Sequence, residues 1–132
     1  MCIRDRANTG LDSFLHINAQ HELIENIPVA PPELAKTFDP DTDYRKVVTT
    51  RPHATHPNYV FVADGKRWIT RFAQQDALCV DDPTRTLPIE VERIHDGIVR
   101  GDTVWFTVVD GHLVGVPLDR SKPTRVLSLI HI

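Results

Sequence analysis

HPNYVFVADGKRWITRFAQQDALCVDD (residues 56–82) and HDGIVRGDTVWFTVVDGHLVGVPLD (residues 95–119) are the two stretches that decide the fold. Each begins with His and a short polar or turn step, followed by an apolar run and a Gly-containing turn. Each then reaches Trp-Ile-Thr or Trp-Phe-Thr and a last apolar stretch that ends in Asp. Aligning His56 with His95 gives a period of 39 residues. A period in this range is typical of repeat proteins built from one small structural unit per repeat.

The local pattern inside the repeat predicts β-strands. Asp64-Gly65, Gly101-Asp102 and Asp110-Gly111 separate the apolar runs, and Asp-Gly between two such runs favours a tight hairpin turn. The expected strands are short and rich in β-branched or aromatic residues, namely 59–63, 68–71, 77–80, 103–108 and 112–116. Short hairpin strands that recur about every 40 residues indicate four-stranded β-propeller blades.

The sequence therefore predicts an all-β protein with antiparallel sheets, a partial β-propeller of about two four-stranded blades plus part of a third. A partial copy near the start, ANTGLDSFLHINAQ (residues 7–20), matches residues 69–82 with Asp12 on Asp76, an offset of 64 residues. Within one propeller fragment, 7–126, we expect the end of a blade at 7–27, a long insertion or loop at 28–52, a full blade at 53–91, and most of the next blade at 92–126. Trp68 and Trp105 share a repeat position, so both are expected to pack between sheets.

The two ends of the chain suggest a non-protein origin. One DNA element read in opposite orientations can encode both MCIRDR (1–6) and LSLIHI (127–132). That element resembles the transposase end sequence of sequencing-library adaptors, and such segments are set aside in fold reasoning. We therefore expect both segments to be adaptor-derived, as in metagenomic assemblies, with the missing blades of the same chain completing the ring. The true termini, a signal peptide and the compartment are then unknown.

Composition narrows the possible partners. The net charge is −3 at pH 7, which gives no electrostatic basis for binding nucleic acid or an anionic membrane surface. No run approaches the roughly 18 apolar residues of a membrane helix. A small-molecule ligand or a protein partner is therefore expected. Setting the ends aside leaves Cys79 as a single cysteine in a strand-like run, where a small core residue is the usual role.

Polar residues at the start of the first strand of each blade are the candidate site. In a propeller this strand lines the central channel, and loops on the rigid ring carry function. His56-Pro57-Asn58 and His95-Asp96-Gly97 both place His and an oxygen ligand there.

These blade-entry motifs resemble those of six-bladed gluconolactonase and senescence-marker-like lactonases, with paraoxonase-like and NHL-type propellers nearby. The resemblance covers residues 53–116. In the lactonases, Asn of Pro-Asn-Gly and Asp of Pro-Asp-Gly help bind a divalent metal. The resemblance thus implies Asn58 and Asp96 as metal ligands, with Asp96 also a candidate catalytic general base. His56 and His95 are further candidate metal ligands, because they occupy the same blade-entry positions. Calcium suits such oxygen ligands, and the metal would polarise a lactone carbonyl.

Here the family motifs are altered, since Tyr59 replaces one Gly and His95 replaces one Pro. Other interpretations remain open. His53, His56 and His95 could form a three-imidazole site for zinc, copper or iron, or hydrogen-bond a neighbouring blade. Arg71, which the second repeat lacks, and His53 could contact substrate.

Three functions follow from these interpretations. The first is a metal-dependent, lactonase-like hydrolase at the channel. The second is a non-catalytic propeller that binds a ligand or partner protein through the channel face and the 28–52 loop. The third is a transferase or oxidoreductase that uses channel histidines.

Overall fold

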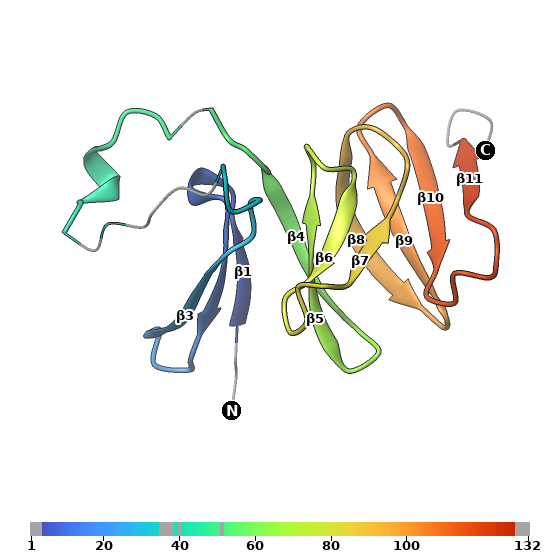
Figure 1. The fold of residues 1–132 in the computed structure, drawn as a ribbon, viewed down its shortest axis with the longest axis horizontal. Helices are drawn as coiled ribbons and strands as arrows, with labels where there is room; N and C mark the ends of the chain where they lie inside the picture. The colour runs from blue at the N-terminus through green and yellow to red at the C-terminus, as the bar shows by residue number, and fades with distance from the viewer. Residues whose placement is uncertain (1–3, 35–38, 40, 51, 129–132) are drawn as a thin grey trace.

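The computed structural model describes residues 4–34, 39, 41–50 and 52–128, which form three antiparallel sheets that follow one another along the chain (Figure 1). Sheet A consists of β1 (Arg4–Asn8), β2 (Ser13–Ile17) and β3 (Leu23–Pro28). Sheet B consists of β4 (Pro57–Ala63), β5 (Lys66–Arg71), β6 (Asp76–Cys79) and β7 (Thr86–Pro88). Sheet C consists of β8 (Ile94–Arg100), β9 (Thr103–Val108), β10 (His112–Pro117) and β11 (Arg125–Ser128).

The order of strands within each sheet is that of a propeller blade. Sheets B and C run β4-β5-β6-β7 and β8-β9-β10-β11, with consecutive strands paired, and sheet A runs β1-β2-β3. The three sheets lie next to one another, since β4 packs against both β1 of sheet A and β8 of sheet C. The predicted all-β class, with antiparallel, blade-like sheets of three, four and four strands, is confirmed.

The boundaries drawn from the sequence fall close to those of the sheets. The predicted insertion, 28–52, starts at the last residue of β3 and continues into the long connection to β4, whose described part includes a 3₁₀ turn, η2 (Tyr44–Lys46) (Figure 1). Strand β1 begins inside the segment assigned to the adaptor, and β11 crosses the other assigned boundary at residue 127. The strand pairing of these residues does not test their origin, which stays a prediction. No helix in the described part of the chain is long and apolar enough to span a membrane.

Two apolar layers hold the three sheets together. Between sheets A and B lie Phe14, Val29, Ile69, Leu78 and Val80. Between sheets B and C lies the larger core, comprising Phe61, Ala63, Trp68, Ala77, Cys79, Leu87, Ile89, Ile94, Val104, Phe106, Val108, Val114 and Val116. Alternation along the strands produces this arrangement, because successive side chains point to opposite faces of a sheet. In β5, Trp68 faces sheet C while Ile69 faces sheet A.

Trp68 fulfils the role expected of the repeated tryptophan. It is 3% exposed, its Nε1 donates to the carbonyl of Ala63 at 3.1 Å, and its ring stacks on Phe61 at a centroid distance of 6.3 Å. Trp105, in contrast, lies on the side of sheet C that faces away from sheet B, where its ring contacts Gly115. Among the described residues, this outer face of sheet C (Ile98, Trp105, Leu113 and Leu127) is not covered by another sheet.

The repeat has a shorter period than the sequence alignment gave. In sheet B, Thr70 Oγ1 accepts a hydrogen bond from the amide of Tyr59, and in sheet C, Thr107 Oγ1 accepts one from the amide of Asp96. Both pairs are related by 37 residues, and so are the β-bulges in β4 and β8. The equivalent of Tyr59 is therefore Asp96, and the period of 39 that paired His56 with His95 is wrong.

The residue equivalent to His56 is Arg93. Both adopt the left-handed conformation just before a first strand, with φ of 51° and 61°. The sequence alignment was wrong because it matched two identical histidines. What the two sheets share at this turn is the left-handed backbone conformation, which His56 and Arg93 both adopt.

The offset between sheets A and B is 63 residues instead of 64. The carbonyl of Asp12 accepts a hydrogen bond from Val29, and the carbonyl of Gln75 accepts the matching bond from Ile89, both at 3.0 Å. Asp12 and Gln75 have φ of 51° and 56°. Asp12 thus corresponds to Gln75, one residue before the Asp76 chosen from the sequence.

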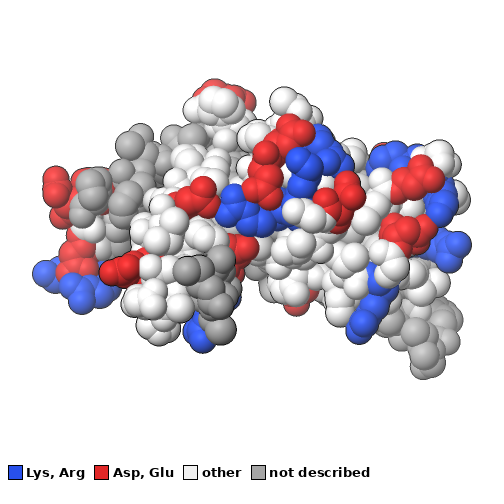
Figure 2. Space-filling model, turned by 90° about the horizontal axis from the view of Figure 1, so that it is seen from below, with Lys and Arg blue, Asp and Glu red and all other residues white. Residues whose placement is uncertain are grey.

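Charged side chains of both signs are interspersed over the face seen in Figure 2. One of the ion pairs joins two sheets, because Arg67 in β5 reaches Glu25 in β3 at 2.7 Å as well as Asp81 at 2.6 Å. The guanidinium also lies 5.1 Å from the centroid of the Phe14 ring. Its hydrogen bonds hold the pKa of Asp81 below the usual range. Arg67 therefore links sheets A and B.

Candidate functional site

The candidate residue Asn58 in β4, together with Thr70 in β5, takes part in contacts between sheets B and C. Asn58 Nδ2 donates to the carbonyl of Ile94, the first residue of β8, at 3.4 Å. Thr70 Oγ1 donates to the carbonyl of His95 at 3.2 Å. Two successive carbonyls of sheet C are therefore held by polar side chains of sheet B.

The junction between sheets A and B has a matching contact. Thr9 Oγ1 donates to the carbonyl of Pro57 at 2.7 Å, and Pro57 in β4 corresponds to Ile94 in β8 under the 37-residue period. A polar side chain thus binds the first residue of the next sheet at both junctions. Unbonded backbone carbonyls are costly to bury, so this contact stabilises the approach of neighbouring sheets.

His95 and Asp96 form a pair at the surface. His95 Nδ1 lies 3.0 Å from Asp96 Oδ1, and their side chains are 54% and 57% exposed. Asp96 lines a shallow cavity together with Tyr59 and residues on the outer face of sheet C, including Ile98 and Trp105. Asp96 is therefore accessible to a ligand, beside an apolar floor.

The divalent metal implied by the lactonase resemblance needs six to eight oxygen ligands if it is calcium. Asn58 and Asp96 supply two side chains, and Asp96 already accepts from His95 if the imidazole Nδ1 carries the hydrogen. In the described ranges there is no group of three or more His, Cys, Asp or Glu side chains placed to hold a metal ion. These residues alone do not fit a calcium shell, and the metal-ligand roles of Asn58, Asp96, His56 and His95 stay predictions.

His53 and His56 lie together in the turn before β4, in a different environment from His95. The two Nδ1 atoms are 3.0 Å apart, and the ring centroids are 5.2 Å apart. Both rings line a cavity with Pro52, Phe72 and Ala73. Of the three histidines proposed as one imidazole site, His53 and His56 form a close pair, and the ring of His95 is instead bonded to its own neighbour, Asp96.

Asp12 fixes the backbone of this turn. Its side chain is buried, with the residue 1% exposed, and its carboxylate accepts three consecutive amides, from Ala54 at 2.7 Å, Thr55 at 3.1 Å and His56 at 2.8 Å. A carboxylate that accepts several backbone N–H bonds is well compensated for burial. The sequence analysis, which used Asp12 only to align the partial repeat, missed this role, because the contact spans more than 40 residues of chain and leaves no local pattern.

Arg71 is occupied within the fold. Its guanidinium binds both oxygens of Asp76, at 2.7 and 2.5 Å, and donates to the carbonyl of Val29 at 3.2 Å. The side chain is only 12% exposed. These contacts join β5 and β6 to the end of sheet A, so they explain the arginine without a substrate.

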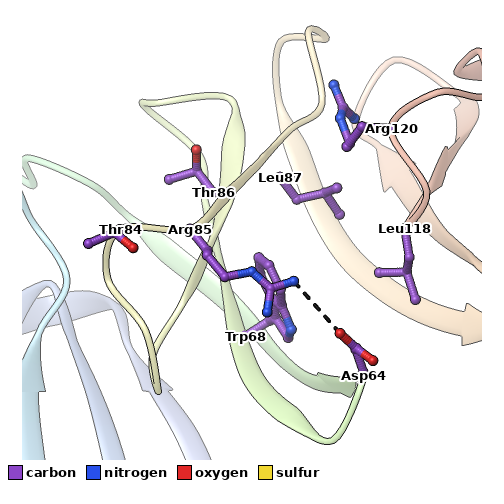
Figure 3. A pocket seen from close by; sticks show the side chains of 8 residues that line it. All are labelled: Asp64, Trp68, Thr84, Arg85, Thr86, Leu87, Leu118 and Arg120. Carbon is purple, nitrogen blue, oxygen red and sulfur yellow. Dashed lines mark ion pairs between the residues drawn. The ribbon is translucent and has the colours of Figure 1, made fainter.

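A further cavity lies between the outer strands of sheets B and C (Figure 3). Arg85 extends over the Trp68 ring, with its Cζ 5.4 Å from the centroid, and pairs with Asp64 at 3.7 Å. Leu87 and Leu118 line the part of the cavity nearer to Arg120 (Figure 3). The sequence did not indicate this cavity, because its lining comes from β5, β7 and turns that lie far apart along the chain.

No model of a known protein family matches the chain, and no curated protein matches it in sequence.

Proposed function

We propose that the chain forms part of a non-catalytic propeller that binds a small-molecule ligand or a protein partner. The observation that carries the proposal is the use of polar side chains at the first strands. Asn58 and Thr70 donate to carbonyls of sheet C, and Arg71 is paired within sheet B. Of the six residues assigned to chemistry from the sequence, Asn58 and Arg71 thus have side chains that connect sheet B to its neighbours.

The outer face of sheet C supports the propeller interpretation. Trp105 stands 37 residues after Trp68, at the equivalent position, and the surface around Trp68 is covered by sheet C. By the same packing we infer that Trp105, Ile98 and Leu113 are covered by a further blade of the ring. An apolar sheet face is stabilised by such burial.

The hydrolase interpretation remains as a second candidate, because Asp96 is accessible. Its carboxylate is more than half exposed and lines a cavity. Asn58 Nδ2 is committed to Ile94, so its Oδ1 is the atom that would face a cation.

Calcium binding and lactone hydrolysis by the full chain test the two candidates. We expect lactone hydrolysis to stay at the uncatalysed rate with or without calcium, and to be the same in Asp96→Asn as in the parent chain. A matched control is Asp110→Asn, since Asp110 forms a similar exposed pair with His112, at 2.7 Å. Calcium-dependent hydrolysis that is lost in Asp96→Asn and retained in Asp110→Asn would overturn the scaffold proposal and favour the hydrolase.

A further inference from the structure

The turn before β4 presents two imidazole nitrogens at a distance suited to chelation. His53 Nδ1 and His56 Nδ1 are separated by 3.0 Å, with the ring planes inclined by 37°. The rings point toward each other and share a hydrogen bond, in which one Nδ1 carries the hydrogen and the other accepts it. Imidazole nitrogen is the commonest protein ligand for transition metals.

The separation of the two nitrogens favours a particular coordination geometry. With metal–nitrogen bonds of about 2.05 Å, nitrogens 3.0 Å apart subtend an angle of about 94° at the ion. A tetrahedral site would instead need a separation of about 3.3 Å at the same bond length. An angle close to 90° is that of neighbouring ligands in a tetragonal complex, which Cu²⁺ and Ni²⁺ prefer.

The protein holds the pair on a fixed backbone. Asp12 accepts the amides of residues 54, 55 and 56, so the segment between the two rings is bound at each step. His56 is held in the left-handed conformation, with φ of 51°. The edge of its ring lies against Phe72, at a centroid distance of 5.4 Å. Such preorganisation lowers the entropic cost of binding an ion.

The far side of the His53 ring has a suitable partner. Thr50 Oγ1 lies 3.1 Å from His53 Nε2. When Nε2 carries the hydrogen and donates it to the hydroxyl, the Nδ1 lone pair is available for a metal, and ligating histidines usually donate their other N–H in this way. The buried Asp12 carboxylate, which accepts the amide of His56, also places a negative charge next to the backbone of this turn.

We propose that His53 and His56 form a two-imidazole chelate site for a late divalent transition metal, Cu²⁺ or Ni²⁺. To bind an ion, the rings rotate out of their shared hydrogen bond, so that both Nδ1 lone pairs turn from the line between the two nitrogens toward the ion. For a neutral pair the displaced Nδ1 hydrogen moves to Nε2 of the same ring, and a protonated pair releases its additional proton to solvent. The cavity beside Pro52 and Phe72 leaves the remaining coordination positions to water or an external ligand.

The test is titration of the full chain with Ni²⁺ by calorimetry and with Cu²⁺ by electron paramagnetic resonance. All variants carry Cys2→Ser, because a thiol binds or reduces copper independently of the proposed site. His53→Gln removes one imidazole. His56→Asn removes the other, and Asn tolerates a left-handed backbone. Far-UV circular dichroism establishes that each variant retains the strand content of the parent.

We expect one Ni²⁺ site per chain whose affinity falls at least about tenfold in His53→Gln and in His56→Asn. The Cu²⁺ spectrum should show coupling to two imidazole nitrogens, reduced to one in either variant. His112→Gln, which removes an exposed imidazole bonded to Asp110, is the matched control and should leave both readouts unchanged. Affinity and nitrogen coupling that persist in the folded double variant His53→Gln/His56→Asn would overturn the proposal.

Discussion

Replacing Asp12 by asparagine should destabilise the junction between sheets A and B more than any comparable change at the surface. Asparagine keeps the size of the side chain and tolerates the left-handed φ of 51° at this position. It replaces one carboxylate oxygen by an NH₂ group. Oδ2 accepts from Ala54, whereas Oδ1 accepts from Thr55 and His56.

The expected loss follows from these three bonds. A hydrogen bond to a charged group contributes about 1.5–3 kcal/mol, and a neutral one about 0.5–1.5 kcal/mol. In Asp12→Asn the bond to Ala54 is lost, and the two bonds at Oδ1 become neutral. Because the bonds share one carboxylate their contributions are not additive, so we expect a decrease of about 3 kcal/mol in the free energy of unfolding. That is a large share of the roughly 5–15 kcal/mol that stabilises a domain.

Urea unfolding of the full chain, followed by circular dichroism, measures this loss. The matched control is Asp64→Asn, which makes the same chemical change at a residue with a φ of 54° and an exposed side chain. Its ion pair with Arg85 spans 3.7 Å at the surface, so the loss of this pair should change stability by less than about 1 kcal/mol. Equal losses in the two variants would refute the role of the buried carboxylate.

Two further predictions concern packing and charge. Gly97→Ala would place a methyl group 2.8 Å from the ring of the fully buried Phe106, whereas Gly115→Ala would place one 2.7 Å from the Trp105 indole on the outer face of sheet C. Because only the indole has room to move, thermal unfolding should show the larger loss of stability, about 1–3 kcal/mol, in Gly97→Ala. A larger loss in Gly115→Ala would contradict this packing. Arg67 lowers the pKa of Asp81 in the folded state. This pair therefore stabilises the protein above the unfolded-state pKa of about 3.9, and the stabilisation is lost as the pH falls through the lowered folded-state pKa. In Arg67→Met the free energy of unfolding should fall less steeply with decreasing pH, and an unchanged slope would argue against the ion pair.

Hydrophobic alternation and turn chemistry predicted five strands of sheets B and C, but not β8, the first strand of sheet C. The strands expected at 59–63, 68–71, 77–80, 103–108 and 112–116 all lie within or overlap β4, β5, β6, β9 and β10. The Asp64-Gly65 turn is a hairpin with φ of 54° and 67°, as that dipeptide favours. Strand β7 (Thr86–Pro88) was missed, because three residues are too few to show alternation.

Register was harder to predict than fold. His56 and His95 are identical residues with similar neighbours, so they dominated the alignment, yet His56 corresponds to Arg93. A left-handed turn before each first strand sets the true period, and several residue types can adopt it at a modest cost. Sequence patterns could not reveal this conformation at His56 or Arg93, since neither is a glycine.

The candidate site depended on contacts that no local pattern encodes. Asn58 was selected for its amide oxygen, and the structure shows its amide nitrogen bonded to Ile94. Arg71 was selected because the second repeat lacks it, but its partners are Asp76 in sheet B and Val29, which directly follows the last strand of sheet A. A residue present in only one repeat can therefore serve a junction that only that repeat forms.

The two sheet junctions differ at the left-handed residue within each sheet. In sheet A this residue is Asp12, just before β2, and its two side-chain oxygens accept three amides of the turn before β4. In sheet B the equivalent residue is Gln75, just before β6, and its backbone carbonyl accepts the matching bond from Ile89. Glutamine has a single side-chain oxygen and no charge, so it cannot hold three consecutive amides in this way. The repeat thus reproduces the backbone bond in both sheets, and the buried carboxylate adds its three amide contacts at the turn that carries His53 and His56.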